Sequence, residues 1–185
     1  MTYSFKYNPD NLTLIYGGAL NNYDGDHYGI VTSIIERPGY EGSDHYYDGN
    51  GLKLDFNNFI KILYSFHDKL YGFADLQYRF VNYKLTGQDG DLRTFDINVN
   101  HNFFNPKAGL NYDFSKYLSA YYSIAIANKE PNRSDYKDNI AEEYPKSERL
   151  LDNELGFKFN NSNILLNQPV LYEIQRPIGI DRRTQ

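Results

Sequence analysis

The segment Tyr71–Tyr83, YGFADLQYRFVNY, carries the pattern that decides the fold. Apolar or small side chains occupy every second position, starting one residue earlier: Leu70, Gly72, Ala74, Leu76, Tyr78 and Phe80. Asp75, Gln77 and Arg79 stand between them. Because successive side chains of a β-strand point to opposite faces, the segment is predicted to be a strand with one apolar and one polar face. A barrel strand that crosses a bilayer needs roughly 9 to 11 such residues, about twice the usual length in a soluble sandwich.

The same alternation returns in five other segments, and this repetition strengthens the prediction. The apolar rows run through residues 12–20, 58–66, 104–112, 118–126 and 151–159. Tyr3, Phe5 and Tyr7 are predicted to end a further strand. The chain therefore contains about seven credible strands and an irregular eighth.

The connections between these strands alternate between short and long. Residues 8–11, 67–69, 113–116 and 160–163 are compact turn sequences, whereas 21–51, 86–93 and 128–147 are longer and polar. Outer-membrane barrels show this asymmetry, because their periplasmic turns are short and their outer loops are long. The predicted fold class is all-β: an antiparallel up-and-down meander of long transmembrane strands that forms part of an outer-membrane β-barrel.

The composition is compatible with this fold. The chain has 19 Tyr and 12 Phe, and aromatic residues make up 17% of it, as aromatic girdles would require. Its mean hydropathy is only -0.67, and no run approaches the ~18 apolar residues of a membrane helix. The formal net charge of -5, without a basic patch, argues against nucleic-acid binding. The absence of cysteine fits envelope and cytosolic proteins alike.

Five segments resemble, in the same order, parts of the C-terminal barrel of TonB-dependent outer-membrane receptors of the Bacteroidota type. They are 22–29 (NYDGDHYG), 74–79 (ADLQYR), 104–112 (FNPKAGLNY), 127–133 (ANKEPNR) and 145–156 (PKSERLLDNELG). The resemblance extends over roughly residues 2–166. Each segment alone is a weak signal, and their common order makes the signal strong.

The resemblance implies a barrel of about 22 strands, closed by a plug domain and energised by the TonB complex through that plug. Such a receptor lies in the outer membrane of a Gram-negative cell and takes up a scarce nutrient, either a ferric siderophore, haem, a cobalamin or a glycan. We expect residues 1–166 to be about a third of the barrel, without plug or signal peptide and not competent for transport alone. The implied partners are outer-membrane lipid, the missing plug and strands, the TonB complex and the substrate.

The alternation is lost in residues 167–185, where Pro169 and Pro177 disfavour a regular ladder. We therefore expect this segment to be an irregular tail outside the barrel segment. When the tail is written with permitted codons and read in a shifted frame, it encodes an aromatic-rich strand that resembles the family. A frameshift near codon 167 is our interpretation, and a genuine divergent tail is the alternative.

Acidic residues and histidines gather in the first predicted outer loop. Weak candidates for binding calcium or a transition metal are Asp24, Asp26, His27, Asp44, His45 and Asp48. The loop has neither the spacing of an EF-hand nor a paired-histidine motif. A solvated outer loop explains these residues more simply, so no confident metal site is predicted.

Two further sets of polar residues are candidates for contacts in an intact receptor. The side chains predicted to face the lumen or the plug are Asp75, Gln77, Arg79, Lys107, Asn111, Glu154 and Lys158. The candidates for binding an anionic ferric chelate at the outer mouth are Arg133, Lys137, Lys146 and Arg149, and loop charges of mixed sign are the default alternative. The sequence shows no nucleophile beside a base and no phosphate loop or cofactor signature, so we predict neither an enzyme nor a bound cofactor.

Two other functions compete with the receptor. A small self-standing outer-membrane barrel with an adhesin or structural role is the first, since eight strands can close. A soluble β-sandwich that acts as a binding module is the second, but it would need shorter strands and a dry inner face.

Overall fold

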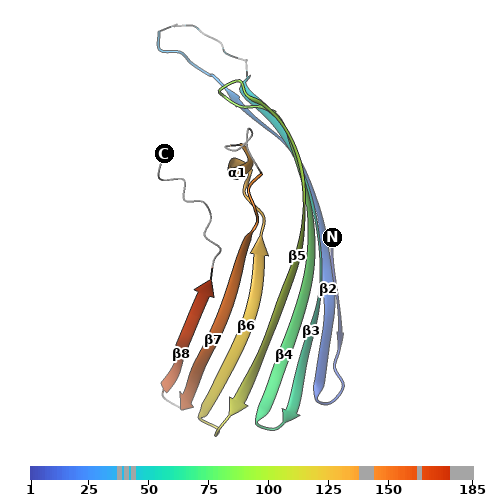
Figure 1. Ribbon diagram of the computed structural model, residues 1–185, viewed down its shortest axis with the longest axis vertical. Helices are drawn as coiled ribbons and strands as arrows, with labels where there is room; N and C mark the ends of the chain where they lie inside the picture. The colour runs from blue at the N-terminus through green and yellow to red at the C-terminus, as the bar shows by residue number, and fades with distance from the viewer. Residues whose placement is uncertain (37–38, 40–41, 43–44, 138–143, 162–163, 176–185) are drawn as a thin grey trace.

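The computed structural model describes residues 1–175 except 37–38, 40–41, 43–44, 138–143 and 162–163. These residues form one antiparallel sheet of eight strands, whose order in space follows the sequence. The strands are β1 (Thr2–Tyr7), β2 (Leu12–Ile30), β3 (His45–His67), β4 (Leu70–Gln88), β5 (Thr94–Asp113), β6 (Leu118–Lys129), β7 (Glu148–Asn161) and β8 (Ile164–Gln175), with one short helix, α1 (Arg133–Lys137). The sheet is curved, and α1 lies on its concave side (Figure 1). The predicted up-and-down meander is therefore confirmed.

The short connections lie where the sequence predicted them. β1 ends at Tyr7 and β2 begins at Leu12, while β3 and β4 are separated by two residues. The break between β5 and β6 and the break between β7 and β8 also coincide with predicted turns. The three described short connections, between β1 and β2, β3 and β4, and β5 and β6, gather at the lower end of the sheet in Figure 1.

The long connections are shorter than predicted, because the strands extend into them. β2 continues to Ile30 and β3 begins at His45, so most of the predicted loop 21–51 is a ladder with pairs such as Asp24 opposite Leu52. β4 likewise extends to Gln88. The expectation of loops there was wrong, because backbone hydrogen bonds hold a ladder together without an apolar row once the strand lies beyond the apolar zone.

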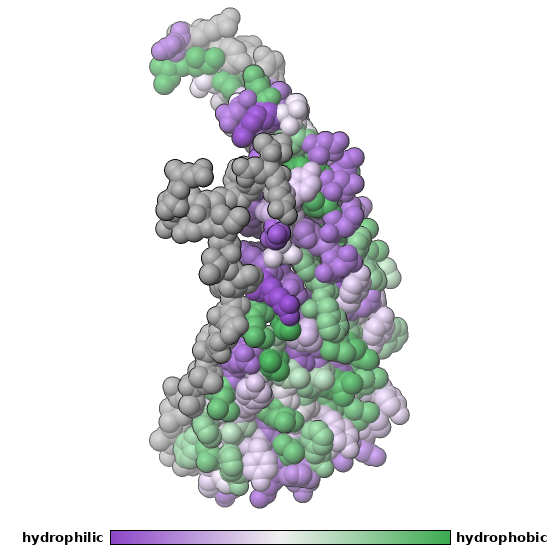
Figure 2. Space-filling view, in the orientation of Figure 1, coloured by the Kyte–Doolittle hydropathy of each residue, from purple (hydrophilic) through white to green (hydrophobic). Residues whose placement is uncertain are grey.

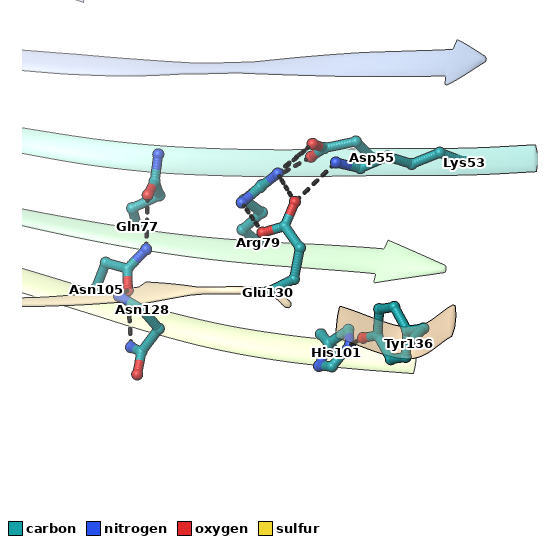
Figure 3. Close-up of polar contacts among 9 residues, drawn as sticks. All are labelled: Lys53, Asp55, Gln77, Arg79, His101, Asn105, Asn128, Glu130 and Tyr136. Atoms are coloured by element: carbon teal, nitrogen blue, oxygen red, sulfur yellow. Dashed lines mark hydrogen bonds and ion pairs between the residues drawn. The ribbon is translucent and has the colours of Figure 1, made fainter. Parts of the chain in front are cut away.

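The register places apolar and polar side chains on opposite faces, as predicted. Along β4, Leu76 and Tyr78 are each 44% exposed on the convex face. Their neighbour Arg79 points to the concave face, which also holds α1 (Figures 1 and 3). Hydrophobic residues are dense over the lower half of the molecule and hydrophilic residues over the upper half (Figure 2). This distribution is typical of strands that cross an apolar layer and continue into water.

A small hydrophobic core lies on the concave face near the upper end, and one of its members, Tyr136, comes from a predicted solvated loop. It consists of Leu85 from β4, Phe95 and Ile97 from β5, and Tyr136 from α1. Tyr136 is only 1% exposed, so α1 is packed against the sheet rather than surrounded by solvent. Among the described residues, no helix is long and apolar enough to cross a membrane.

The predicted irregular tail is partly a strand. Residues 167–175 belong to β8 and pair with β7, so the expectation that the alternation break would end the sheet was wrong for this part. The register shifts where Gly156 faces Pro169 and Leu155 faces Leu171, which leaves Val170 as a bulge. A bulge beside a proline that lacks a backbone donor lets a strand continue past it. Residues 176–185 lie outside the described part, and the frameshift remains a prediction.

Gly87 supplies a test of the upper ladder between β3 and β4. Its φ is +141°, and an added Cβ would overlap the carbonyl oxygen of Asp48. We expect Gly87→Ala to destabilise this pairing by about 1–3 kcal/mol, because the side chain is incompatible with both the backbone conformation and the space. Amide hydrogen exchange of residues 48–50 should become at least several-fold faster.

Gly90 provides the matched control for this substitution. An added Cβ there would meet only ring atoms of Tyr46, at 3.7 Å or more. Gly90→Ala should therefore leave exchange in β3 unchanged. Equal exchange in the two variants would show that the ladder at Gly87 relaxes without cost.

Candidate functional site

Four charged side chains form a connected cluster on the concave face, which we call the ion cluster: Lys53 and Asp55 of β3, Arg79 of β4, and Glu130 just after β6 (Figure 3). The Arg79 guanidinium donates to Asp55 through Nε at 3.0 Å and Nη2 at 2.5 Å. It also donates to Glu130 through Nη1 at 2.8 Å. Lys53 Nζ completes the cluster with a 2.7 Å bond to Glu130 Oε1. Glu130 is thus held by two cations at once.

Strand register explains why β3 and β4 contribute to this cluster. Arg79 faces Asn57 across the ladder, and Asp55 lies two residues further along on the same face. A diagonal pair of this kind is within reach of a long side chain. Glu130 comes from a part of the chain that is distant in sequence, and it reaches the cluster because the chain turns inward after β6.

The ion cluster favours the charged form of Glu130. Burial alone would raise the pKa of this carboxyl, but hydrogen bonds from Lys53 and Arg79 outweigh burial and lower the pKa to about 2. Only 15% of the Glu130 side chain is exposed. A partly buried carboxylate with two cationic donors is well compensated, and removal of its charge would leave the cations unmatched.

A chain of side-chain amides connects β5 and β6 at the point where the two strands stop pairing. The β5–β6 ladder ends where Lys107 faces Ala125, although β6 continues to Lys129. Beyond that point, Asn105 accepts hydrogen bonds from the backbone N–H of Asn128 at 3.0 Å and from its side chain at 2.8 Å. Asn105 in turn donates to Gln77 at 2.9 Å (Figure 3). The Asn105 side chain thus takes the place of a backbone partner for the N–H of Asn128.

The chain that follows β6 is fixed at a second point by Tyr136. Its hydroxyl lies 2.6 Å from Nε2 of His101 on β5, and its ring packs in the small core (Figure 3). Burial raises the pKa of Tyr136 to about 12. Lys137 lies over the Phe95 ring, 5.5 Å from its centre. We call residues 130–137 the strap, because this segment crosses the concave face between two attachments, Glu130 in the ion cluster and Tyr136 in the small core.

A cavity of about 450 Å³ lies between the strap and the sheet. Its charged lining consists of four cations, Lys53, Arg79, Lys129 and Arg133, and one carboxylate, Glu130. Tyr23, Tyr83 and His27 are also among its lining residues, and the Tyr23 hydroxyl lies 3.1 Å from Nε2 of His27. A cavity with this lining can bind an anionic group through charge-assisted hydrogen bonds.

The structure places the predicted lumen-facing residues on one face. Asp75 faces Lys107, and Glu154 faces Ser123, across ladders that keep all seven residues in the same alternation. Gln77 and Arg79 contribute directly to the site, whereas Glu154 accepts a 2.7 Å hydrogen bond from Tyr121 in another part of the face. Contact with a plug remains a prediction.

The weak metal candidates are not brought together. Asp24 and Asp26 both accept hydrogen bonds from Asn50 at 2.9 Å, whereas His27 lines the cavity on the other face. His45 Nδ1 lies 2.8 Å from Asp48. Asp44 lies outside the described residues. In the described part of the chain, no group of three His, Asp or Glu side chains could hold a metal ion.

Of the four predicted loop cations, one lies at the cavity. Arg133 lines it, whereas Lys137 contacts aromatic rings and Arg149 lies in β7 opposite Asn128. Lys146 lies in the stretch between α1 and β7 and does not line the cavity.

The sequence prediction missed several residues of the site. Lys53 and Asp55 alternate with leucines in residues 52–55, which is a strand pattern. This pattern is short and follows directly after the predicted first loop, so it was not assigned to a strand. Glu130 reaches Arg79, and Tyr136 reaches His101, through contacts between distant segments. No local pattern in the sequence indicates such contacts.

The ion cluster predicts a pH-dependent strap. Because the folded pKa of Glu130 lies below the ordinary value of 4.5, its stabilisation is complete above pH 4.5 and is lost as the pH falls towards 2. The chain has no cysteine, so a nitroxide on Ser134→Cys, an exposed position in α1, reports on the strap alone. We expect the mobile fraction in its spin-resonance spectrum to rise as the pH falls from about 5 to about 2.

Glu130→Gln is the decisive comparison for this titration. The variant should be mobile already at pH 7, because losing the charge costs about 1–3 kcal/mol of charge-assisted bonding, and it should lack the Glu130 part of the acid transition. Asp55, His101 and Tyr136 remain in both proteins, so the difference between the curves isolates Glu130. Superimposable curves would mean that the carboxylate does not hold the strap.

Comparison with known proteins supports the fold. No family model and no curated protein matches the chain. Similar solved structures include the ferric yersiniabactin uptake receptor FyuA from Yersinia pestis, with a TM-score of 0.58, 11% identity and coverage of 87% of this chain and 26% of that one. The FrpB iron transporter from Neisseria meningitidis has a TM-score of 0.56 at 18% identity, covering 87% and 25%. The ferric-catecholate import receptor Fiu from E. coli K12 has a TM-score of 0.56 at 14% identity, covering 88% and 28%.

The chain spans about a quarter of the length of these receptors. At identities below 20%, the likeness concerns the fold. The described sheet therefore resembles in fold a section of the β-barrels of these proteins.

Proposed function

We propose that the chain forms part of the barrel wall of a TonB-dependent outer-membrane receptor, of the type found in Bacteroidota, that imports a scarce nutrient. The observation that carries this proposal is the long meander with an apolar convex face and a charged concave face. The similarity of its fold to a quarter of three uptake proteins adds support. In such a receptor the wall works together with a plug and the TonB complex, so the chain does not transport by itself.

A ferric siderophore, haem, a cobalamin and a glycan are all compatible with a receptor of this kind. The three similar proteins are named for ferric yersiniabactin, iron and ferric catecholate. This favours an iron chelate within the proposal, and the cationic cavity suits a chelate that carries negative charge.

A self-standing small barrel is the second candidate, because the described sheet has eight strands, a number that can close. Closure would require β1 to pair with β8. In the described part of the chain these two strands are the unpaired edges of the sheet. Open edges within a bilayer are costly, so other strands are needed on both sides if the sheet is to remain as described.

The lipid-facing assignment is tested by two neighbouring substitutions in β6. Ile124 is 40% exposed on the convex face, whereas Ser123 lies on the concave face opposite Glu154. We expect Ile124→Arg in the full-length protein to reduce the folded, heat-modifiable band in outer membranes strongly, because arginine in the middle of a bilayer costs about 2–4 kcal/mol.

Ser123→Arg is the matched control, since the new charge faces Glu154 instead of lipid. Its folded band should stay near the level of the parent protein. If Ile124→Arg assembles as well as Ser123→Arg, or increases the yield of detergent-free protein, the membrane proposal is wrong and the soluble module takes its place.

A further inference from the structure

The cavity under the strap has more positive charge than its own carboxylates neutralise. Lys53 and Arg79 share Glu130, and Arg79 also pairs with Asp55. Lys129 and Arg133 line the same cavity, and neither forms an ion pair within the described part of the chain. Glu130 and Asp55 thus pair with two of the four cations and leave Lys129 and Arg133 over, so the cavity has room and charge for a further anion.

Glu130 is the member of the ion cluster that can be exchanged. Asp55 lies on a central strand, and its three hydrogen bonds from Arg79 keep the guanidinium in place whatever happens at Glu130. Glu130, in contrast, follows the end of β6 and is not part of a ladder. A carboxylate that enters the cavity can therefore bind to a guanidinium that is already oriented, which reduces the entropic cost of binding.

Two contacts outside the ion cluster limit how much of the chain would move. Asn128 is bonded to Asn105 on one side of Glu130, and Tyr136 is buried against β4 and β5 on the other. Neither of these contacts involves the ion cluster. Departure of Glu130 would therefore free a short stretch between them and leave the sheet unchanged.

We propose that the cavity is a binding site for an anionic, carboxylate-type group, that Glu130 occupies this site in the ligand-free protein, and that ligand binding displaces Glu130 and releases the strap. The inference rests on the proposed function only in that the ligand reaches the cavity from the barrel interior. It adds a class of ligand and an internal competitor to that function. Binding and strap release are coupled, because Glu130 and the ligand compete for Lys53 and Arg79.

The experiment measures glutarate binding to the purified full-length protein by calorimetry. Glutarate is a suitable probe, because it carries the carboxylate of a glutamate side chain on a similar carbon chain. Lys53→Gln should weaken its affinity about tenfold or more, because one charge-assisted bond is lost. Glu130→Gln should strengthen the affinity about tenfold, because the competing carboxylate is gone.

Lys61→Gln is the control for both variants. Lys61 lies on the same strand and the same face as Lys53, but it contacts the Phe73 ring and does not line the cavity. Its substitution by glutamine changes the net charge by the same amount as Lys53→Gln. Its affinity for glutarate should stay within about twofold of the parent. If Lys61→Gln and Lys53→Gln lose the same glutarate affinity, the loss is due to the overall charge of the protein, and the proposed binding site is wrong.

The strap is followed in the same samples by the nitroxide on Ser134→Cys. Glutarate should increase the mobile fraction in the parent protein, and in Glu130→Gln the strap should be mobile without it. Unchanged or weaker glutarate affinity in Glu130→Gln would overturn the competition. No measurable glutarate binding, or binding with an immobile strap, would overturn the proposal as well.

These readouts do not depend on transport. If the Ile124→Arg and Ser123→Arg pair contradicts the membrane proposal while the glutarate pattern holds, the binding site stands and the receptor function fails. If Ile124→Arg and Ser123→Arg behave as expected but the glutarate pattern is absent, the receptor function stands and the proposal that a ligand displaces Glu130 is wrong.

Discussion

The continuous antiparallel register of β2 to β5 is the constraint on which the rest of the structure depends. Each ladder pairs residues without interruption over most of its length, for example from Asp48–Gln88 to Ser65–Tyr71 between β3 and β4. A slip of one residue would turn every side chain to the other face. Arg79 would then point to the apolar convex side, and the ion cluster and the cavity could not form. The site is thus a product of strand length as much as of residue type.

The sequence predicted what depends on neighbouring residues. Period-two alternation identified the faces of β4 and β6, and turn chemistry located the short connections, because both effects act within a few residues. The inward direction of Arg79 followed from the same alternation. Where polar residues replaced the apolar row, as in residues 21–30, alternation gave no signal, although the backbone ladder continued. The prediction that Pro169 ends the regular ladder was wrong, because a bulge accommodates this proline and β8 continues past it.

The strap was beyond prediction, because its contacts join segments far apart in sequence. Glu130 bonds to Lys53 and Arg79 across separations of 77 and 51 residues, and Tyr136 reaches His101 across 35. Composition pointed the other way, since residues 128–147 are polar and resemble a solvated loop. The fold of the sheet decides these contacts, and no local pattern in residues 128–147 indicated that this segment returns to a core.

The two attachments of the strap rest on different physical forces, and this difference gives the segment its expected behaviour. Tyr136 is held by burial of an aromatic ring, which dissolved anions and moderate changes of pH hardly alter. Glu130 is held by charges, which protons and competing anions weaken directly. A segment with one apolar and one ionic attachment can open at the ionic end while the apolar end keeps it in place. Reclosure is then a local event, because the strap never leaves the concave face.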